Sequence, residues 1–376
     1  MSFQKRYLFS SSKKQSILKK SLFFLGILFG VSLSLVPEQS LLSVGRDPFL
    51  TSIYEARSDL QKAFDQNSWN AFPESSAGFL IDLQDWAQQY GWREYPHLLD
   101  DYAPVSSPPL HTGYDIVPSV SAHAYSILDR KTGMVLAQKN STDVWPIASL
   151  TKLMTASVVL DRPISLSSLH SIEAEDEVGG ARLSVYPGTT YTTDDLLYAT
   201  LVASANNAAR ALSHATDLSE EDFILAMNTK AQELGMPHTH FVESSGIETE
   251  NVSTAREMAR LAMHVFANKD IRRYTTTASK SILSPSSGIE KKITSTNWML
   301  WKPTYNDLYV MSGKTGYLNE SKWNFVVSLR QDLSNEHNEL LLVVFGADSR
   351  ADSFADAHHL ANWAWDNFVW SQEQVN

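Results

Sequence analysis

The chain has 376 residues, of which 43% are apolar and 19% are charged, so it can form one large folded domain or two ordinary ones. Its net charge is −11, and residues 38–376 hold 25 basic against 42 acidic side chains, which excludes a nucleic-acid binder that needs a basic face. It contains no cysteine, which excludes disulfides, thiol catalysis and cysteine-ligated metal sites.

The N-terminus combines a basic stretch with an apolar one. Residues 1–20 carry six basic and no acidic side chains, and residues 22–36 form an uncharged apolar run. The length of this run lies at the border between the apolar region of a signal peptide, about 7–15 residues, and a membrane-spanning helix, about 17–25. We interpret residues 1–37 as a signal or membrane anchor and favour a retained anchor through residues 21–37. Either interpretation places the acidic body outside the cytoplasm, in the cell envelope, tethered or secreted.

Residues 38–121 are expected to form a helical and proline-rich extension. Apolar residues at helical spacing predict helices over residues 52–64 and 79–90, and the proline-rich residues 103–109 are typical of a linker. Because this region carries no catalytic signature, we interpret it as a spacer or as a helical pair packed on the main domain.

The main domain is expected over residues 122–372, and it opens with two strands. The strand-like runs 123–128 and 134–139 are joined by Asp129-Arg-Lys-Thr-Gly133. Glycine at the end of such a short connection is typical of a β-hairpin, so we predict a hairpin here.

A mostly helical section follows, and strands return near the end of the chain. Thr193 predicts the start of a helix over residues 194–202, and Thr254 and Glu257 have the spacing of a capping box. A helix is expected after Arg350, and it is preceded by strands at residues 308–311, 324–329 and 340–345. This order predicts an α+β fold with one antiparallel sheet built from both ends of the domain.

Ser149-Leu-Thr-Lys152 is the central motif of the chain. Pro146 suits the first turn of a helix, whose apolar face would contain Ile147, Leu150, Met154 and Val158. Residues three apart lie side by side on a helix, so the amine of Lys152 can reach the hydroxyl of Ser149. A serine hydroxyl needs a base at neutral pH, and a lysine can serve when burial and a neighbouring cation lower its pKa. We therefore predict Ser149 as a nucleophile and Lys152 as its base.

Two further motifs follow in order, and each is weak evidence by itself. Ser204-Ala-Asn206 comes after a predicted helix, and Lys314-Thr-Gly316 comes after a predicted strand. The pattern of the last motif also occurs at residues 131–133, but there it lies in the predicted hairpin turn and before the serine. Order and context therefore distinguish the functional motifs from chance matches.

In this order the three motifs resemble the signature of the penicillin-recognising serine enzymes. Over roughly residues 122–370 the chain is similar to the low-molecular-mass penicillin-binding proteins, the D-alanyl-D-alanine carboxypeptidase and endopeptidase family (peptidase S11). The segments that carry this resemblance are residues 146–155, 195–209, 240–246, 253–256 and 313–317. The resemblance implies a β-lactamase/transpeptidase-like fold, in which helices flank a five-stranded antiparallel sheet and a mostly helical subdomain is inserted.

The resemblance also implies a role for each catalytic residue. Ser149 would attack the carbonyl between the two terminal D-alanines of a peptidoglycan stem peptide, and Lys152 would take its proton. Ser204 would relay a proton to the leaving amine, and Asn206 would hold the substrate amide and Lys152. Water would then hydrolyse the acyl-enzyme. The implied partners are peptidoglycan stem peptides and, as covalent inhibitors, β-lactam antibiotics; no metal or other cofactor is implied.

The substrate-binding residues follow from the last motif. Lys314 would supply positive charge for the substrate's terminal carboxylate, and Thr315 would supply a hydroxyl for the same group. Gly316 has no side chain, so the substrate would lie against its strand. The backbone N–H groups of Ser149 and Tyr317 would form the oxyanion hole.

Several departures from the family pattern keep alternatives open. Asn207 stands where many members carry Asp, and residues 318–325 replace a stretch that usually contains Ala-Gly. The 60 residues after Gly316 leave no room for the C-terminal domain of many carboxypeptidases, a domain that endopeptidases also lack. A D,D-endopeptidase that cleaves peptidoglycan crosslinks is therefore an alternative to the carboxypeptidase.

The sequence favours three other interpretations less than the peptidase. A β-lactamase on the same fold needs a deacylating glutamate after the second motif, and Glu243 and Glu248 lie in range without the expected E-x-x-L-N pattern. A catalytically inactive wall-binding module is disfavoured by the intact motifs. A metal site is disfavoured because His238-x-His240 and His358-His359 are the only close histidine sets, and the acidic run 173–177 is expected to be a solvated face.

Overall fold

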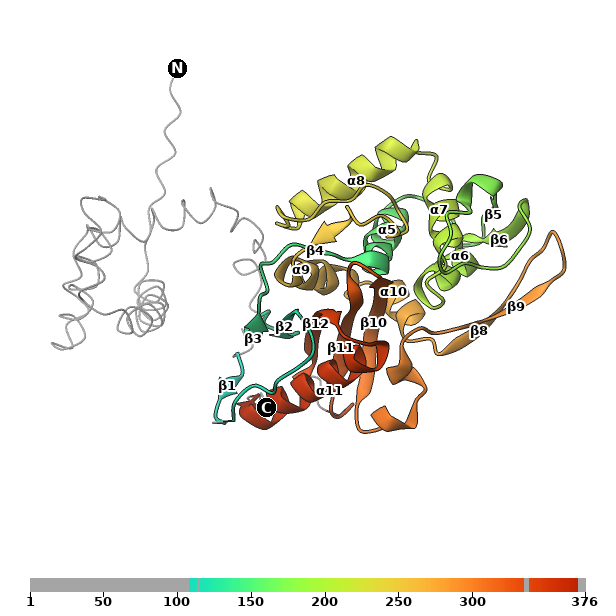
Figure 1. The fold of residues 1–376 in the computed structure, drawn as a ribbon. Helices are drawn as coiled ribbons and strands as arrows, with labels where there is room; N and C mark the ends of the chain where they lie inside the picture. The colour runs from blue at the N-terminus through green and yellow to red at the C-terminus, as the bar shows by residue number, and fades with distance from the viewer. Residues whose placement is uncertain (1–107, 114, 335–337, 371–376) are drawn as a thin grey trace, which may run out of the picture. The chain divides into compact units, whose positions relative to one another are not determined.

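A computed structural model describes residues 108–113, 115–334 and 338–370 (Figure 1). Its centre is a five-stranded antiparallel sheet in the order β10-β11-β12-β2-β3. The strands are β2 (Ala124–Asp129), β3 (Val135–Lys139), β10 (Tyr309–Leu318), β11 (Lys322–Arg330) and β12 (Leu340–Ala347). Two strands come from the start of the domain and three from its end, which confirms the predicted α+β fold and its five-stranded sheet.

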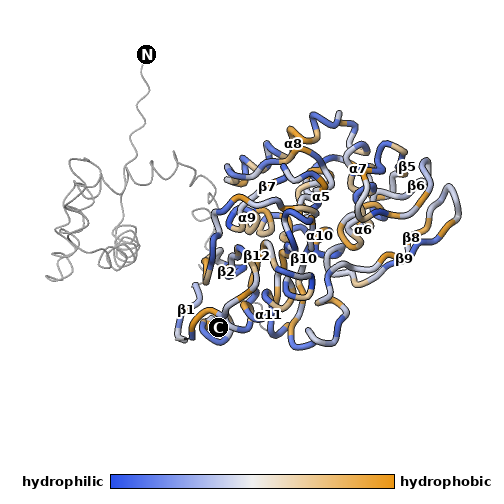
Figure 2. The backbone as a smooth tube through the Cα atoms, in the orientation of Figure 1, coloured by the Kyte–Doolittle hydropathy of each residue, from blue (hydrophilic) through white to orange (hydrophobic). Residues whose placement is uncertain are grey.

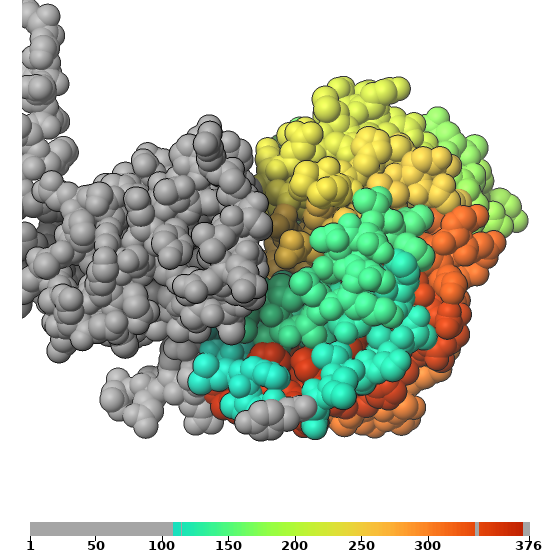
Figure 3. All heavy atoms as spheres, turned by 60° about the vertical axis from the view of Figure 1, so that its left-hand side comes forward, coloured from blue at the N-terminus to red at the C-terminus, as the bar shows by residue number. Residues whose placement is uncertain are grey.

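The two ends of the domain meet in the middle of this sheet. β12 pairs antiparallel with β2, with Leu342 opposite Ile127. Figure 3 shows the same relation on the surface, where the first and last parts of the described domain lie side by side. The hairpin between β2 and β3 is confirmed: Thr132 donates from its backbone N and its hydroxyl to the carboxylate of Asp129, and Gly133 has a φ of 72°.

Both faces of the sheet are covered. Alternate side chains of each strand point to opposite faces, so each face presents apolar side chains that pack against helices. Helix α11 (Arg350–Asn367) covers one face, where Phe325 and Leu342 meet Phe354. Helices α5 (Thr151–Leu160) and α9 (Ala255–Val265) belong to the cluster on the other face, which includes Val326 and Val343. In Figure 2 hydrophobic stretches occur in the sheet and its adjacent helices, and further ones lie in the rest of the domain.

The section between the two halves of the sheet is mostly helical, as predicted. Its further helices are α6 (Thr193–Leu201), α7 (Asn206–His214), α8 (Glu220–Glu233) and α10 (Lys269–Thr275). It also contains two hairpins, which pair β5 (Leu169–Ile172) with β6 (Thr189–Thr192) and β8 (Ser279–Leu283) with β9 (Glu290–Thr294).

Short elements complete the described chain. β1 (Leu110–His111) pairs with β13 (Phe368–Val369), and β4 (Trp145–Pro146) pairs with β7 (Val252–Ser253). The 3-10 turns are η3 (Ala148–Leu150), η4 (Ala174–Asp176), η5 (Trp298–Leu300) and η6 (Pro303–Tyr305).

Three predicted helix starts differ in detail. Pro146 is in β4 and not in a helix, because Ala148 has a φ of 52° and breaks a regular helix before α5 begins. The side chain that caps α6 is that of Thr192, one residue before the predicted Thr193. Thr254 caps α9 as predicted. The carboxylate of Glu257, however, accepts from the backbone N of His238 and not from that of Thr254, so only half of the capping box forms.

Several predictions fall outside the described residues. These are the anchor over residues 1–37, the helices over 52–64 and 79–90, and most of the linker over 103–109. None of the helices within residues 108–370 combines the length and the apolar character needed to cross a membrane. The division of the chain at residues 121 and 122 stays a prediction.

Candidate active site

Ser149 lies in the 3-10 turn η3, just before α5. The amine of Lys152 donates a hydrogen bond to its hydroxyl at 3.0 Å, as the spacing of the motif predicts. Two residues in or next to the motifs have left-handed backbone: Ala148, which precedes Ser149, with a φ of 52° and Ser204 with a φ of 60°. Such conformations cost roughly 1–3 kcal/mol each and persist where the surrounding structure imposes them, often at active sites.

Lys152 is completely buried. Besides Ser149, its amine donates to Oδ1 of Asn206 at 2.6 Å and to the backbone carbonyl of Ser245. Burial lowers the pKa of Lys152 to about 7, and the negative charge of Glu243 acts in the opposite direction. A lysine with this pKa is partly neutral at neutral pH, so it can accept the proton of a serine hydroxyl.

A second buried lysine stands on the other side of the site. The amine of Lys314 donates to the hydroxyl of Ser204 and to the carbonyl of Thr315, each at 2.8 Å. Burial lowers the pKa of Lys314 well below its usual value, and the charges of Lys152 and Arg350 lower it further. The site therefore contains two serine–lysine pairs, built from motifs that are far apart in sequence.

Asn206 and Asn207 begin α7 and have different tasks. Asn206 accepts from Lys152, as expected, but its amide nitrogen donates to the carbonyl of Gly179 at 2.8 Å. Asn207 is buried and pairs with both the N–H and the carbonyl of Leu183, each at 2.9 Å. Its amide also donates to Glu177 at 2.7 Å, so this departure from the family pattern anchors the loop before β6.

Gly316 brings strand β10 against the nucleophile turn. A Cβ at this position would lie 2.8 Å from the carbonyl oxygen of Ile147 and 3.3 Å from the backbone N of Ser149. The absent side chain therefore makes room for the turn. The expectation that substrate lies against this strand stays a prediction. Tyr317, the next residue, is half exposed and its ring stacks on Trp323 at 4.1 Å.

Thr315 is connected to two residues, Thr296 and Arg350, that no sequence motif indicates. Its hydroxyl donates to that of Thr296 at 2.6 Å, and Arg350 donates to the carbonyl of Thr296 at 2.8 Å. The guanidinium of Arg350 lies 4.8 Å from the ring centre of Trp298, and its buried Nε has no hydrogen-bond partner among the described residues. No motif marks Arg350 or Thr296, because tertiary packing alone brings them to β10.

The histidine pairs have structural partners. His238 Nδ1 lies 2.7 Å from Glu257, and His358 Nε2 lies 2.6 Å from Asp307. Within the described ranges no three His, Asp or Glu side chains are arranged to hold a metal ion. The acidic run 173–177 is not wholly a solvated face as expected, because Asp176 is buried beside His214.

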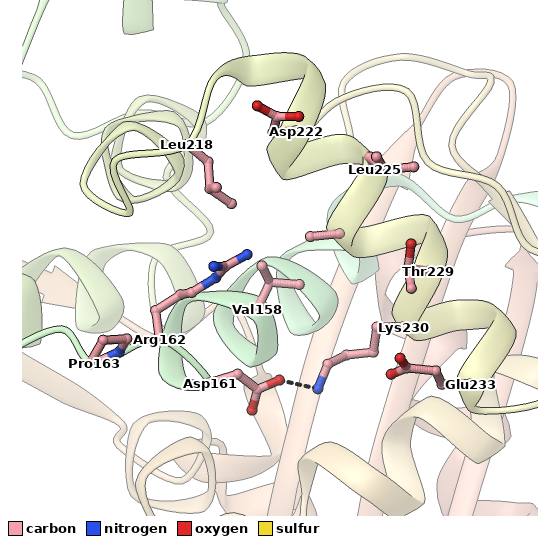
Figure 4. A pocket seen from close by; sticks show the side chains of 11 residues that line it. Val158, Asp161, Arg162, Pro163, Leu218, Asp222, Leu225, Thr229, Lys230 and Glu233 are labelled. Atoms are coloured by element: carbon pink, nitrogen blue, oxygen red, sulfur yellow. Dashed lines mark ion pairs between the residues drawn. The ribbon is translucent and has the colours of Figure 1, made fainter.

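An open groove of about 590 Å³ lies elsewhere in the domain, between the end of α5 and α8 (Figure 4). It is lined by Val158, Leu218 and Leu225, among others, and is crossed by the ion pair of Lys230 with Asp161. None of the motif residues lines it, so this groove is separate from the site around Ser149.

Comparisons with known proteins agree with this geometry. The family profile of the D-alanyl-D-alanine carboxypeptidases, peptidase S11, matches residues 112–349. The chain is 32% identical to a D-alanyl-D-alanine endopeptidase of Pseudomonas aeruginosa, an alignment that covers 69% of this chain and 82% of that protein. It is 28% identical to a D-alanyl-D-alanine carboxypeptidase of Bacillus subtilis, covering 64% of this chain and 61% of that protein.

Solved structures show the same fold. A mutant of the Streptomyces K15 DD-transpeptidase matches with a TM-score of 0.60 and 25% identity, over 66% of this chain and 99% of that one. An evolved putative penicillin-binding protein homologue from Mycobacterium tuberculosis matches with a TM-score of 0.61 and 25% identity, over 72% and 99%. The ordered motifs, the sheet and the matched family profile lead to one conclusion: this chain belongs to the D-alanyl-D-alanine carboxypeptidase family, peptidase S11.

Proposed function

We propose that this protein is a serine-type D-Ala-D-Ala carboxypeptidase that acts on peptidoglycan stem peptides through an acyl-enzyme on Ser149. The observation that carries the proposal is the fully buried amine of Lys152, 3.0 Å from the hydroxyl of Ser149. Ser149 itself is only half-buried, so a substrate can reach it.

Acylation uses the two serine–lysine pairs in turn. Ser149 Oγ attacks the carbonyl carbon of the scissile peptide bond, and neutral Lys152 accepts its proton. Ser204, whose hydroxyl accepts a hydrogen bond from Lys314, delivers a proton to the leaving amine nitrogen and regains one from protonated Lys152, which is neutral again for the second half-reaction. The C–N bond breaks, terminal D-alanine leaves, and an ester to Ser149 remains.

The substrate's carboxylate helps to set the protonation of the site. Lys314 offers it positive charge, and Thr315 offers it a hydroxyl. Arg350, which is hydrogen-bonded to the neighbouring Thr296, offers further positive charge. Two buried ammonium groups repel each other, so one proton is readily lost. A bound carboxylate favours the protonated form of Lys314, which leaves Lys152 as the neutral base.

The nucleophile turn helps to stabilise the oxyanion in both acylation and hydrolysis of the acyl-enzyme. The backbone N–H groups of Ser149 and Tyr317 stabilise the negative oxygen that develops in both steps. Water then attacks the ester carbonyl, and the proton that Lys152 accepts from this water returns to Ser149 Oγ. The cycle needs no electron transfer.

Cleavage of crosslinks is the second candidate function. The relative with 32% identity is named an endopeptidase, and so is one from Escherichia coli with 31% identity. The chemistry is the same, but the leaving amine belongs to a neighbouring stem peptide. The β-lactamase alternative is weaker, because the carboxylate of Glu243 already accepts hydrogen bonds from the backbone of residues 245 and 246 and from the amide of Asn251. Glu248 lies outside the expected pattern.

We place the enzyme in the cell envelope, where its substrate lies. The basic residues 1–20 and the apolar residues 22–36 support a tether through residues 21–37 in the cytoplasmic membrane. A full-length protein recovered in the membrane fraction after a high-salt wash would support the tether, and a mature N-terminus beyond residue 37 would refute it.

Penicillin labelling tests the proposed function. Penicillin mixed with the purified full-length protein should give a lasting adduct in the intact mass. Ser149→Ala should form none, which assigns the adduct to Ser149. Wild type should also release D-alanine from a pentapeptide. Crosslinked and uncrosslinked muropeptides then separate the two peptidase activities. Penicillin consumed without a lasting adduct would identify a β-lactamase, and penicillin left intact would contradict the acyl-enzyme.

A further inference from the structure

We propose that Glu243 is a positioning residue of this active site: its carboxylate holds residues 245–247 so that the carbonyl of Ser245 meets the amine of Lys152. The inference rests on the proposed function and concerns the setting of its base. Among the described residues Glu243 has no hydrogen bond to Ser149, and it acts through the segment that it organises.

The carboxylate of Glu243 is buried and is surrounded by hydrogen-bond donors. One oxygen accepts from the backbone N and the hydroxyl of Ser245, each at 2.6 Å. The other accepts from the backbone N of Gly246 at 2.5 Å, from that of Ile247 at 3.0 Å and from the amide of Asn251 at 2.7 Å. Three consecutive backbone N–H groups thus converge on one anion, an arrangement that fixes the direction of their carbonyls.

The segment held in this way contacts the catalytic machinery at two points. The carbonyl of Ser245 accepts from Lys152. Gly246 has a φ of +80°, and a Cβ there would lie 2.0 Å from the carbonyl oxygen of Ala148, next to the nucleophile. A change in the conformation of this segment therefore reaches both the base and the nucleophile turn.

Glu243 also supplies the negative charge that faces Lys152. Burial lowers the pKa of Lys152, and Glu243 raises it. The other charged groups in the site are Lys314 on β10 and Arg350 on α11, while Ser149, Ser204 and Asn206 are neutral. Replacing the carboxylate with an amide should therefore lower the pKa of Lys152 further and move the acid limb of catalysis to lower pH.

The test is the pH dependence of penicillin acylation in Glu243→Gln, followed by intact mass. We expect the midpoint of the acid limb to fall by about 0.5 pH unit or more and the limiting rate constant to fall about tenfold or more. A Glu243→Gln enzyme with the wild-type midpoint would overturn the proposal, whatever its rate.

Glu257 offers a matched control. It is also a buried glutamate, and it accepts from the backbone N of His238 at 3.1 Å and the hydroxyl of Thr239 at 2.6 Å, away from Lys152. Glu257→Gln should lower the melting temperature but keep the wild-type midpoint. If both glutamine variants shift the midpoint equally, loss of stability explains the shift and the proposal fails.

Glu243→Asp separates the effect of the negative charge from the effect of side-chain length. The shorter side chain keeps the charge but cannot reach all five donors, so the rate constant should fall while the midpoint stays at the wild-type value. This variant decides the matter if Glu243→Gln does not fold, because a wild-type rate constant in Glu243→Asp would overturn the proposal. A wild type that forms no adduct at any pH would refute the proposed function itself, and the role of Glu243 would fall with it.

Discussion

At the scale of single residues, the site depends on two lysines that are removed from water. Lys152 and Lys314 are both buried, and each donates to one serine hydroxyl. A surface lysine is protonated at neutral pH and has no lone pair to offer. Burial is therefore what converts Lys152 from a cation into a base, and sequence motifs alone do not report burial.

The pKa of Lys152 predicts the pH dependence of acylation. The base must be neutral, so the rate of adduct formation with penicillin should rise with pH and level off above about 7. Well below the midpoint the rate should fall about tenfold per pH unit, because the neutral fraction falls by that factor. Rapid-mixing mass spectrometry between about pH 5 and 9 measures this. A rate that is flat from pH 5 to 7 would argue against Lys152 as the base.

At the scale of elements, the nucleophile turn η3 is placed by its neighbours. Strand β10 approaches it at Gly316, and the segment after Glu243 approaches it at Gly246. β4 leads into it and is fixed to β7 by pairing of Pro146 with Val252. Glycine at both contacts lets backbone meet backbone, which is why the turn can keep the left-handed conformation of Ala148.

Gly316→Ala tests this contact. The added Cβ would lie 2.8 Å from the carbonyl oxygen of Ile147, so either β10 or the turn must move. We expect the rate of acylation by penicillin to fall about a hundredfold, since small displacements of reacting groups are costly. Gly288→Ala is the control: its Cβ would meet nothing within 4 Å, and acylation should stay at the wild-type rate. Equal rates in the two variants would contradict the role of Gly316.

At the scale of the whole molecule, the fold joins the two ends of the domain. β2 pairs with β12, and the carboxylate of Asp356 on α11 accepts from the backbone N of Ala122 at 2.9 Å and the hydroxyl of Ser121 at 2.8 Å. The sheet, which carries the last motif on β10, therefore needs both ends of the domain to be present.

Asp356→Ala should destabilise the domain without changing its chemistry. It leaves a buried N–H without its acceptor, so the free energy of unfolding should fall by about 1–3 kcal/mol, while acylation of the folded protein stays unchanged. Urea unfolding measures the loss. Asp348→Ala, which removes an exposed ion pair with Lys322, should cost less than about 1 kcal/mol. Equal losses in both variants would show that Asp356 does not tie the ends together.

Much of this protein was determined by its sequence alone. The five strands, the helical insert and the closing helix were predictable, because apolar periodicity reports which face of a segment is buried. The pairing of Ser149 with Lys152 was predictable too, because residues three apart are neighbours within one turn. The turn at residues 131–133 was distinguished from the functional motif at Lys314 by its position in a hairpin.

Tertiary structure decided the rest. The turn at Ala148 could not be predicted locally, because the close backbone contacts that accommodate it come from Gly246 and Gly316, which are distant in sequence. Arg350 and Thr296 join the site through packing of α11 and the segment before β10, and no local pattern marks them. Glu243 lies in the segment 240–246 that carries the family resemblance, but no sequence pattern assigned it this role, since the role depends on a loop folded around it. Local spacing determines which side chains are neighbours on one element, whereas burial and long-range contacts, which set the pKa of a base, exist only in the folded molecule.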